Sequence, residues 1–227
     1  VALRNTNHWM RAGTYGLQAA RKNCIGICAT NTTPNVPPWG GRDATVGNNP
    51  MVIAVPHDPY PILLDMAMSQ FSYGKMEVLE RLGKKLPVAG GFDRELRPTD
   101  VPGAILESGL AMPTGYWKGS ALAMMIDLLV AILSGGSTTR QIGEQDEEYA
   151  VSQVFMALDL EQLSDAEHRG RAIRAVIDSL LETRPVEPEG RVFYPGQQTW
   201  MRREENQSKG IPVDPQTWEE ILALDNN

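Results

Sequence analysis

Residues 24–30 read Cys-Ile-Gly-Ile-Cys-Ala-Thr and lie between two asparagines. A short apolar run bounded by turn-forming residues is typical of a buried strand, so we predict one here. Residues 51–55 and 61–66 are similar runs separated by a proline-rich turn, and residues 151–160 form another. Residues 1–3 are expected to belong to a buried strand as well. The predicted sheet therefore draws on segments spread along most of the sequence.

Five segments carry the spacing of apolar residues that is typical of helices: 11–23, 69–82, 118–133, 165–182 and 215–224. The segment 118–133 is apolar on nearly every side and is therefore predicted to be buried. Strands that alternate with helices predict an α/β (α+β) fold, with a mixed sheet and flanking helices. Between the strands, residues 31–50 are rich in Pro, Gly, Asn and Thr, and long ordered loops of this kind are often functional.

The 227 residues include 21 Lys plus Arg and 28 Asp plus Glu, a net charge of −7. This acidic total argues against a nucleic-acid partner, which would need a clustered excess of basic residues. Residues 1–50 nevertheless hold five basic side chains and one acidic one, a net charge of +4. That basic front indicates either an anionic small-molecule ligand or an accident of surface composition.

Targeting and metal-binding signals are not visible. The longest apolar run, 121–133, is shorter than the about 20 residues that cross a bilayer, and Asp127 interrupts it. No charged segment followed by an apolar one indicates a signal peptide. Cys24 and Cys28 would lie about 13 Å apart on a strand, too far for a disulfide. We therefore expect a cytoplasmic protein with two free thiols, no membrane association and no metal site.

Local patterns suggest two candidate sites near the front of the chain. His8 follows the opening strand and precedes a helix, where it would serve either as an acid or base or as a structural histidine. The loop 37–42, Pro-Pro-Trp-Gly-Gly-Arg, offers backbone N–H groups, a guanidinium and an aromatic face. Such a set suits a phosphate or carboxylate, but it is equally consistent with a rigid turn.

Three charged residues further along have similar alternatives. Asp65 ends an apolar strand and is expected either to face a ligand or to cap a helix. Lys118 lies in Gly115–Gly119, at the start of the apolar helix, where free N–H groups form a potential anion site. Asp127 lies within that helix and needs a partner if it is buried, for which a salt bridge is expected.

The G-x-G-x-x-G fingerprint of common dinucleotide-binding folds is absent, as are the P-loop and G-x-S-x-G motifs. Six other segments occur in a recognisable order: Asn5–Trp9, Gly26–Thr32, Pro38–Gly40, Gly47–Pro50, Leu64–Ser69 and Gly115–Gly119. This succession, which covers the whole chain, resembles the type 2 malate/lactate dehydrogenase family.

The resemblance implies an NAD(P)H-binding fold that is not the Rossmann fold, which accounts for the missing fingerprint. It implies hydride transfer from NADH, or from NADPH, to the C2 ketone of a small-molecule 2-oxo acid, here a 2-oxo sugar acid. Malate, lactate, ureidoglycolate or a cyclic imino acid remain alternatives, as does a fragment that binds the cofactor without catalysis. The resemblance also implies a homodimer whose active site lies near the subunit contact.

Site residues follow from the resemblance position by position. His8 matches the catalytic histidine of the N-x-N-H motif, and Thr32 matches a Ser/Thr contact to the cofactor. The other cofactor contacts are expected at Pro61, Ile62, Leu63, Leu64, Asp65, Met66, Ala67, Trp117, Lys118, Gly196, Gln197 and Gln198. At Gly196–Gln198 the sequence departs from its relatives, which often have His or Glu there.

On this basis residues 1–160 are predicted to form the NAD(P)H-binding and catalytic domain, and residues 161–227 a C-terminal region of helix and loop. Members of the family begin with a helical region that carries a Ser-His-Gly motif, and in some of them that histidine is considered the proton donor. The motif is absent from these 227 residues. We therefore expect the sequence to be a fragment.

Overall fold

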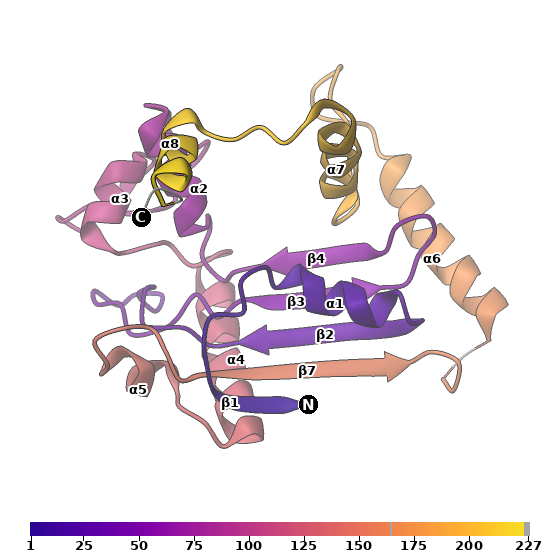
Figure 1. The fold of residues 1–227 in the computed structure, drawn as a ribbon, viewed down its shortest axis with the longest axis horizontal. Helices are drawn as coiled ribbons and strands as arrows, with labels where there is room; N and C mark the ends of the chain where they lie inside the picture. The colour runs from indigo at the N-terminus through magenta and orange to yellow at the C-terminus, as the bar shows by residue number, and fades with distance from the viewer. Residues whose placement is uncertain (164, 225–227) are drawn as a thin grey trace. The chain divides into compact units, whose positions relative to one another are not determined.

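The computed structural model of the chain describes residues 1–163 and 165–224. It divides into two compact units, Val1–Arg169 and a second that begins at Gly170. The predicted division into a domain of residues 1–160 and a C-terminal region of residues 161–227 stays a prediction. Figure 1 shows the elements of both units.

The first unit is built on a five-stranded sheet with the strand order β1-β7-β2-β3-β4. The strands are β1 (Ala2–Thr6), β2 (Cys24–Thr30), β3 (Met51–Val55), β4 (Ile62–Met66) and β7 (Val151–Asp159). For four of them, both ends were predicted to within one residue. Strand β1 runs three residues further than the expected segment. Every described pairing between them is antiparallel. The α+β class with flanking helices is confirmed, and the sheet is antiparallel where a mixture of directions was expected.

One helix covers each face of the sheet (Figure 1). On one face lies α1 (Gly13–Ala20), which approaches so closely that a Cβ on Gly16 would lie 2.6 Å from Cγ1 of Val52. On the other face lies α4 (Trp117–Ser134), whose Ala123, Ile126 and Val130 pack with residues of β2 and β7 in one core cluster. Because successive side chains of a strand point to opposite faces, both faces of the sheet must be covered by apolar surface.

Two expectations about burial were wrong. The residues of β1 are exposed or half-buried because β1 is an edge strand, paired to β7 alone. The helix α4 is buried only along the side that faces the sheet, while its large apolar residues elsewhere are 41–73% exposed. The sequence pattern could not distinguish a helix that its own chain buries on all sides from one whose outer apolar side stays exposed.

A smaller layer extends the first unit beyond β4. It contains α2 (Tyr73–Arg81), β5 (Gly91–Phe92), β6 (Pro98–Thr99) and α3 (Pro102–Ser108). Met76, Ile105 and Ala111 form its fully buried core together with Val36. Helix α2 was predicted, whereas the others lie in a stretch that has no periodicity of its own.

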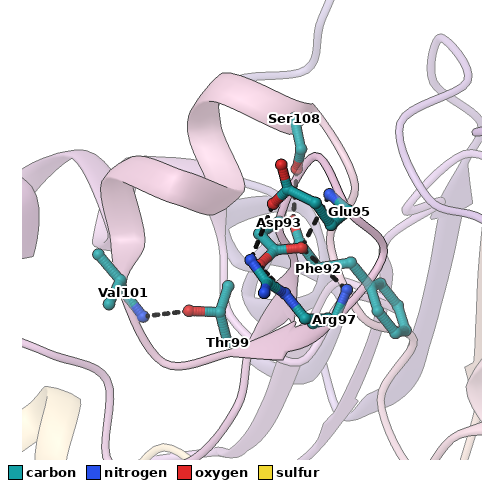
Figure 2. Close-up of polar contacts among 7 residues, drawn as sticks. All are labelled: Phe92, Asp93, Glu95, Arg97, Thr99, Val101 and Ser108. Carbon is teal, nitrogen blue, oxygen red and sulfur yellow. Dashed lines mark hydrogen bonds and ion pairs between the residues drawn. The ribbon is translucent and has the colours of Figure 1, made fainter.

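The turn between β5 and β6 is closed by one carboxylate (Figure 2). Asp93 accepts hydrogen bonds from the backbone N–H groups of Glu95 and Arg97, both at 2.9 Å, and from Nε of Arg97 at 2.9 Å. The Arg97 backbone N–H is the main reason that the pKa of Asp93 lies below its ordinary value. This short ribbon therefore depends on an ionised aspartate.

Between α4 and β7 lies a short helix, α5 (Thr139–Gly143). Thr138 and Gln141 form a capping box at its start, which the sequence analysis missed. Among the described residues, α4 is the one helix long and apolar enough to cross a membrane by length and composition alone. One such helix is weak evidence for a membrane span, because the core helix of a soluble protein passes the same test.

Helix α6 (Ala166–Leu181) crosses the boundary between the units, and the second unit continues with α7 (Gln197–Lys209) and α8 (Pro215–Leu224). The start of α8 was predicted correctly, since Oδ1 of Asp214 accepts the Thr217 backbone N–H at 3.0 Å. Helix α7 was missed because most of its residues are polar and no apolar stripe marks it.

Candidate active site

Loops from all five strands meet at one edge of the sheet, which we name the strand-end edge. The pairing of Thr6 with Val151 places the end of β1 beside the start of β7. In the same way, Ala29 near the end of β2 pairs with Met51 at the start of β3, and Met51 pairs with the last residue of β4. The segments that follow β1, β2 and β4 therefore leave the sheet at the same end, and they contain His8, Thr32 and Ala67, although β1 and β4 are the two outer strands.

A buried network of polar side chains joins this edge to the middle of α4. Asn31, 1% exposed, donates from Nδ2 to Asp127 Oδ1 at 2.8 Å and accepts the Ser152 backbone N–H on Oδ1 at 2.8 Å. Asp127 Oδ1 also accepts the backbone N–H of Thr139 at 2.8 Å. The salt bridge expected at Asp127 is therefore wrong: the partners of this carboxylate are a neutral amide and a backbone N–H.

A second buried asparagine holds the segment that contains Thr32. Asn49 is 0% exposed, and its Oδ1 accepts the Thr32 backbone N–H at 3.0 Å. Its Nδ2 donates to the carbonyl of Ala123 in α4 at 2.8 Å. Asn31 and Asn49 thus attach the loops after β2 and before β3 to one helix, and we name these two residues with Asp127 and Thr139 the polar belt.

The hydroxyl of Thr32 is surrounded by acceptors. Its Oγ1 lies 3.0 Å from Asn48 Oδ1, 3.1 Å from the Thr33 carbonyl and 3.4 Å from Asn49 Oδ1. A hydroxyl carries one hydrogen, and any of these oxygens can take it. A ligand that reached Thr32 would therefore meet an acceptor, as a ribose hydroxyl or an amide N–H requires.

The segment from Pro61 to Ala67 leads directly to the start of α4. The Met68 backbone N–H donates to the Asn48 carbonyl at 2.7 Å, and the Met68 carbonyl accepts the Thr114 backbone N–H at 2.8 Å. Met68, just after β4, is thus hydrogen-bonded to Thr114, just before Trp117 and Lys118. In this way the structure brings together the predicted residues on β4 and those on α4.

The carboxylate of Asp65 has a structural partner. Its Oδ2 accepts the Gly13 backbone N–H at 2.8 Å, at the start of α1. The helix-cap alternative therefore describes this side chain, and a Cβ on Gly13 would lie 2.8 Å from the same oxygen. Other atoms of Asp65 remain part of the predicted cofactor segment.

His8 is exposed at the strand-end edge. Its Nδ1 accepts the Met10 backbone N–H at 3.1 Å, so a neutral ring carries its proton on Nε2. Gln153 holds the preceding residue by donating from Nε2 to the Asn7 carbonyl at 2.9 Å. The imidazole is thus oriented by the chain around it, with one nitrogen left for a substrate.

The remaining predicted residues lie at two helix starts. Trp117 and Lys118 are exposed in the first turn of α4, where no side chain caps the helix. Gly196 precedes α7 with φ +89°, and Gln197 Oε1 accepts the Tyr194 backbone N–H at 3.2 Å. Gly196–Gln198 belong to the second unit and are described by themselves. No group of metal-binding side chains occurs within residues 1–163 and 165–224.

Comparisons with known proteins agree with this arrangement. The family described as malate/L-lactate dehydrogenase matches residues 1–222. The chain belongs to the malate/L-lactate dehydrogenase family.

Two relatives within the family are named 2,3-diketo-L-gulonate reductase. The protein of Citrobacter koseri is 41% identical over 225 residues, and that of Klebsiella pneumoniae 42%; each match covers 99% of this chain and 68% of the relative. The chain therefore spans about two thirds of the length of these relatives.

Solved structures of the family share the fold. A malate dehydrogenase from Entamoeba histolytica, 25% identical, superposes with a TM-score of 0.93 over 100% of this chain and 67% of its own. A sulfolactate dehydrogenase from Methanocaldococcus jannaschii, 29% identical, gives 0.84 over 100% of this chain and 65% of its own.

Sequence reasoning missed the polar belt almost entirely. Asn31 and Asn49 are buried polar residues, but in the sequence they look like ordinary loop asparagines. The one available signal was Asp127, a charge inside an apolar helix that had to find partners.

Proposed function

We propose that the chain carries the cofactor-binding and catalytic part of an NAD(P)H-dependent reductase of 2-oxo acids. Its preferred substrate would be 2,3-diketo-L-gulonate, reduced at C2 to 3-dehydro-L-gulonate. The two relatives with that name and their coverage of nearly the whole chain support this choice. The observation that carries the proposal is the strand-end edge, where the segments that contain His8, Thr32 and the end of β4 leave the sheet at the same end.

The residues present suit a dinucleotide. The start of α4 has no side-chain cap, and its positive end lies beside the Lys118 ammonium, which suits phosphate groups, although the Lys118 N–H itself donates to the Gly115 carbonyl at 3.3 Å. Thr32 offers an acceptor for a hydroxyl or amide, and β4 offers an extended wall from Pro61 to Ala67. Gly196–Gln198, in the second unit, stay a cofactor contact that the family resemblance alone implies. When bound, the reduced nicotinamide supplies the hydride that goes to the substrate C2.

The chain's own part in the reaction concerns the oxygen on C2. As C2 gains a hydride, this oxygen develops negative charge and needs a proton. In the neutral ring Nδ1 accepts the Met10 N–H, so His8 must first take up a second proton at Nδ1 and release that N–H. We assign the proton for the substrate oxygen to Nε2 of this imidazolium, which becomes a neutral imidazole when it gives the proton up. One hydride and one proton would then convert the ketone to a hydroxyl.

A homodimer belongs to the same proposal. Beyond the first turn of α4, seven large apolar residues are exposed: Leu122, Met124, Met125, Leu128, Leu129, Ile132 and Leu133. A contiguous patch of this kind marks an interaction surface. We assign it to a second copy of the chain, in a cytoplasmic enzyme that uses neither nucleic acid nor a membrane.

Leu129→Glu should therefore yield monomers by light scattering. Val78→Glu is the matched control, because Val78 is a similarly exposed apolar residue on α2. A wild-type chain that is already monomeric would contradict the assignment.

The decisive experiment follows the loss of nicotinamide absorbance with NADH or NADPH and a panel of 2-oxo acids. The panel contains 2,3-diketo-L-gulonate, oxaloacetate, pyruvate and a cyclic imino acid, so that it also ranks the substrates. The proposal expects faster turnover of the sugar acid than of the other substrates. The comparison of NADH with NADPH identifies the preferred cofactor. Cofactor binding without turnover of any substrate would instead identify the chain as a binding fragment.

A further inference from the structure

The loop 37–42 is attached to the start of α4. The Trp39 backbone N–H donates to Ser120 Oγ at 3.0 Å, and the Gly41 N–H donates to the Pro38 carbonyl at 2.7 Å. Gly40 takes φ +86°, a conformation that suits glycine. The loop is therefore a tight turn held against the helix, and it fixes the position of the Trp39 indole.

The ring of Tyr116, the residue just before α4, lies against this indole. The two ring centroids are 5.0 Å apart and the rings are tilted by 53°. Tyr116 has φ 61° and ψ −119°, which is a strained backbone for any residue with a side chain. A glycine would adopt this conformation without strain, so the tyrosine is tolerated at a cost to the fold.

Both rings remain in contact with water despite this arrangement. Trp39 is 51% exposed and Tyr116 56% exposed, and the adjoining Trp117 is 61% exposed. The turn and the strained residue thus hold an aromatic surface outward instead of packing it into the core. Rings held in this way offer a face on which another planar ring can stack.

We propose that Trp39 and Tyr116 form a stacking platform for the adenine ring of the cofactor. This inference rests on the proposed function. The platform directly adjoins Trp117 and Lys118, and the Lys118 ammonium and the start of α4 suit the phosphates. The nicotinamide is expected along β4, which joins the residues before Trp117 through the bond from Thr114 to Met68. The adenine then lies at the far end of the dinucleotide, on the exposed pair.

The test measures dissociation constants of the full chain by titration calorimetry. The probes are NADH, AMP as the adenine half, and nicotinamide mononucleotide as the other half. Trp39→Leu and Tyr116→Gly should each weaken NADH and AMP about tenfold, because stacking of one base on an aromatic side chain supports a change of that order. Nicotinamide mononucleotide should bind as it does to the wild type.

Two controls separate stacking from folding. Tyr116→Phe keeps the ring and should keep the affinity, whereas Tyr116→Gly relieves the strained φ and should not lower the melting temperature. Trp218→Leu removes an equally exposed tryptophan, 50% exposed on α8, and should leave AMP binding unchanged.

Unchanged NADH and AMP affinities in Trp39→Leu and Tyr116→Gly would overturn the platform while leaving the proposed function intact. Equal weakening of nicotinamide mononucleotide would overturn it too, since the pair would then support the site in general. A wild-type chain that binds none of the three probes would contradict both the platform and the proposed function. Turnover by the platform variants at saturating NADH tests the function separately.

Discussion

Replacement of Asn49 by alanine gives the sharpest test of the polar belt. The side chain is 0% exposed and connects the Thr32 N–H, at 3.0 Å, to the Ala123 carbonyl, at 2.8 Å. Asn49→Ala removes both bonds in a place that water does not reach, together with the longer contacts of Oδ1 with the hydroxyls of Thr139, at 3.3 Å, and Thr32, at 3.4 Å. The two backbone groups that lose their partner, however, do not cost the same free energy.

The Thr32 N–H would lose its acceptor and become a buried, unpaired donor, which costs about 1–3 kcal/mol. The Ala123 carbonyl would keep its bond within the helix and lose only an additional one, worth about 0.5–1.5 kcal/mol. We therefore expect Asn49→Ala to lower the free energy of unfolding by about 2–4 kcal/mol.

Urea denaturation followed by circular dichroism measures this loss, provided that the slope with denaturant does not change. Asn48→Ala is the matched control. Asn48 is half-buried, and its Oδ1 accepts only side-chain donors, from Asn35 at 3.1 Å and Thr32 at 3.0 Å. Water can replace these partners, so the control should lose about 1 kcal/mol or less. Equal losses in the free energy of unfolding for the two variants would refute the reasoning that the belt depends on buried hydrogen bonds that water cannot replace.

Three further predictions concern single side chains. His8→Gln should lower turnover about 100-fold with little change in cofactor affinity, measured by steady-state kinetics and calorimetry; unchanged turnover would remove His8 from proton transfer. The pKa of Asp93 is held below its ordinary 3.8 mainly by the Arg97 backbone N–H, so its stabilising effect is complete above that value and is lost as pH falls through the lower folded value. Asp93→Asn should make urea midpoints less dependent on pH in that acidic range, and an unaltered pH profile would contradict the assignment. Burial raises the pKa of the Cys28 thiol to about 11, so iodoacetamide at pH 8 should modify the half-buried Cys24 first, as seen by peptide mass spectrometry.

The strands were predictable because each depends on local sequence. Residues 24–30 and 51–55 are apolar, rich in β-branched or small residues, and bounded by turn formers, and both became strands with those bounds. The pairing of strands was not predictable in the same way. Strand β7 enters between β1 and β2 from more than a hundred residues away, and no local signal specifies that choice.

The candidate site was predictable only where a residue type announces its chemistry. His8, Lys118 and Asp127 stood out as polar groups beside apolar segments, and the family resemblance supplied the other positions. Asn31 and Asn49 gave no such signal, because their importance comes from burial and from partners far along the chain. Asp65, by contrast, was conspicuous in the sequence as a carboxylate at a strand end, but its side chain holds the start of α1.

The helix α4 links the parts of the molecule that the sequence presented separately. Its inner side receives the polar belt, through the Ala123 carbonyl and Asp127, and so fixes the loops that carry Thr32. Its start presents Lys118 and supports the turn of Trp39 through Ser120. Leu122, at the near end of its exposed apolar side, lies only about 6 Å along the helix axis from Lys118. Whatever covers that side must therefore approach the start of α4, and a second copy placed there would lie beside the cofactor. The proposed dimer would therefore have its active site close to the subunit contact, with one helix serving both.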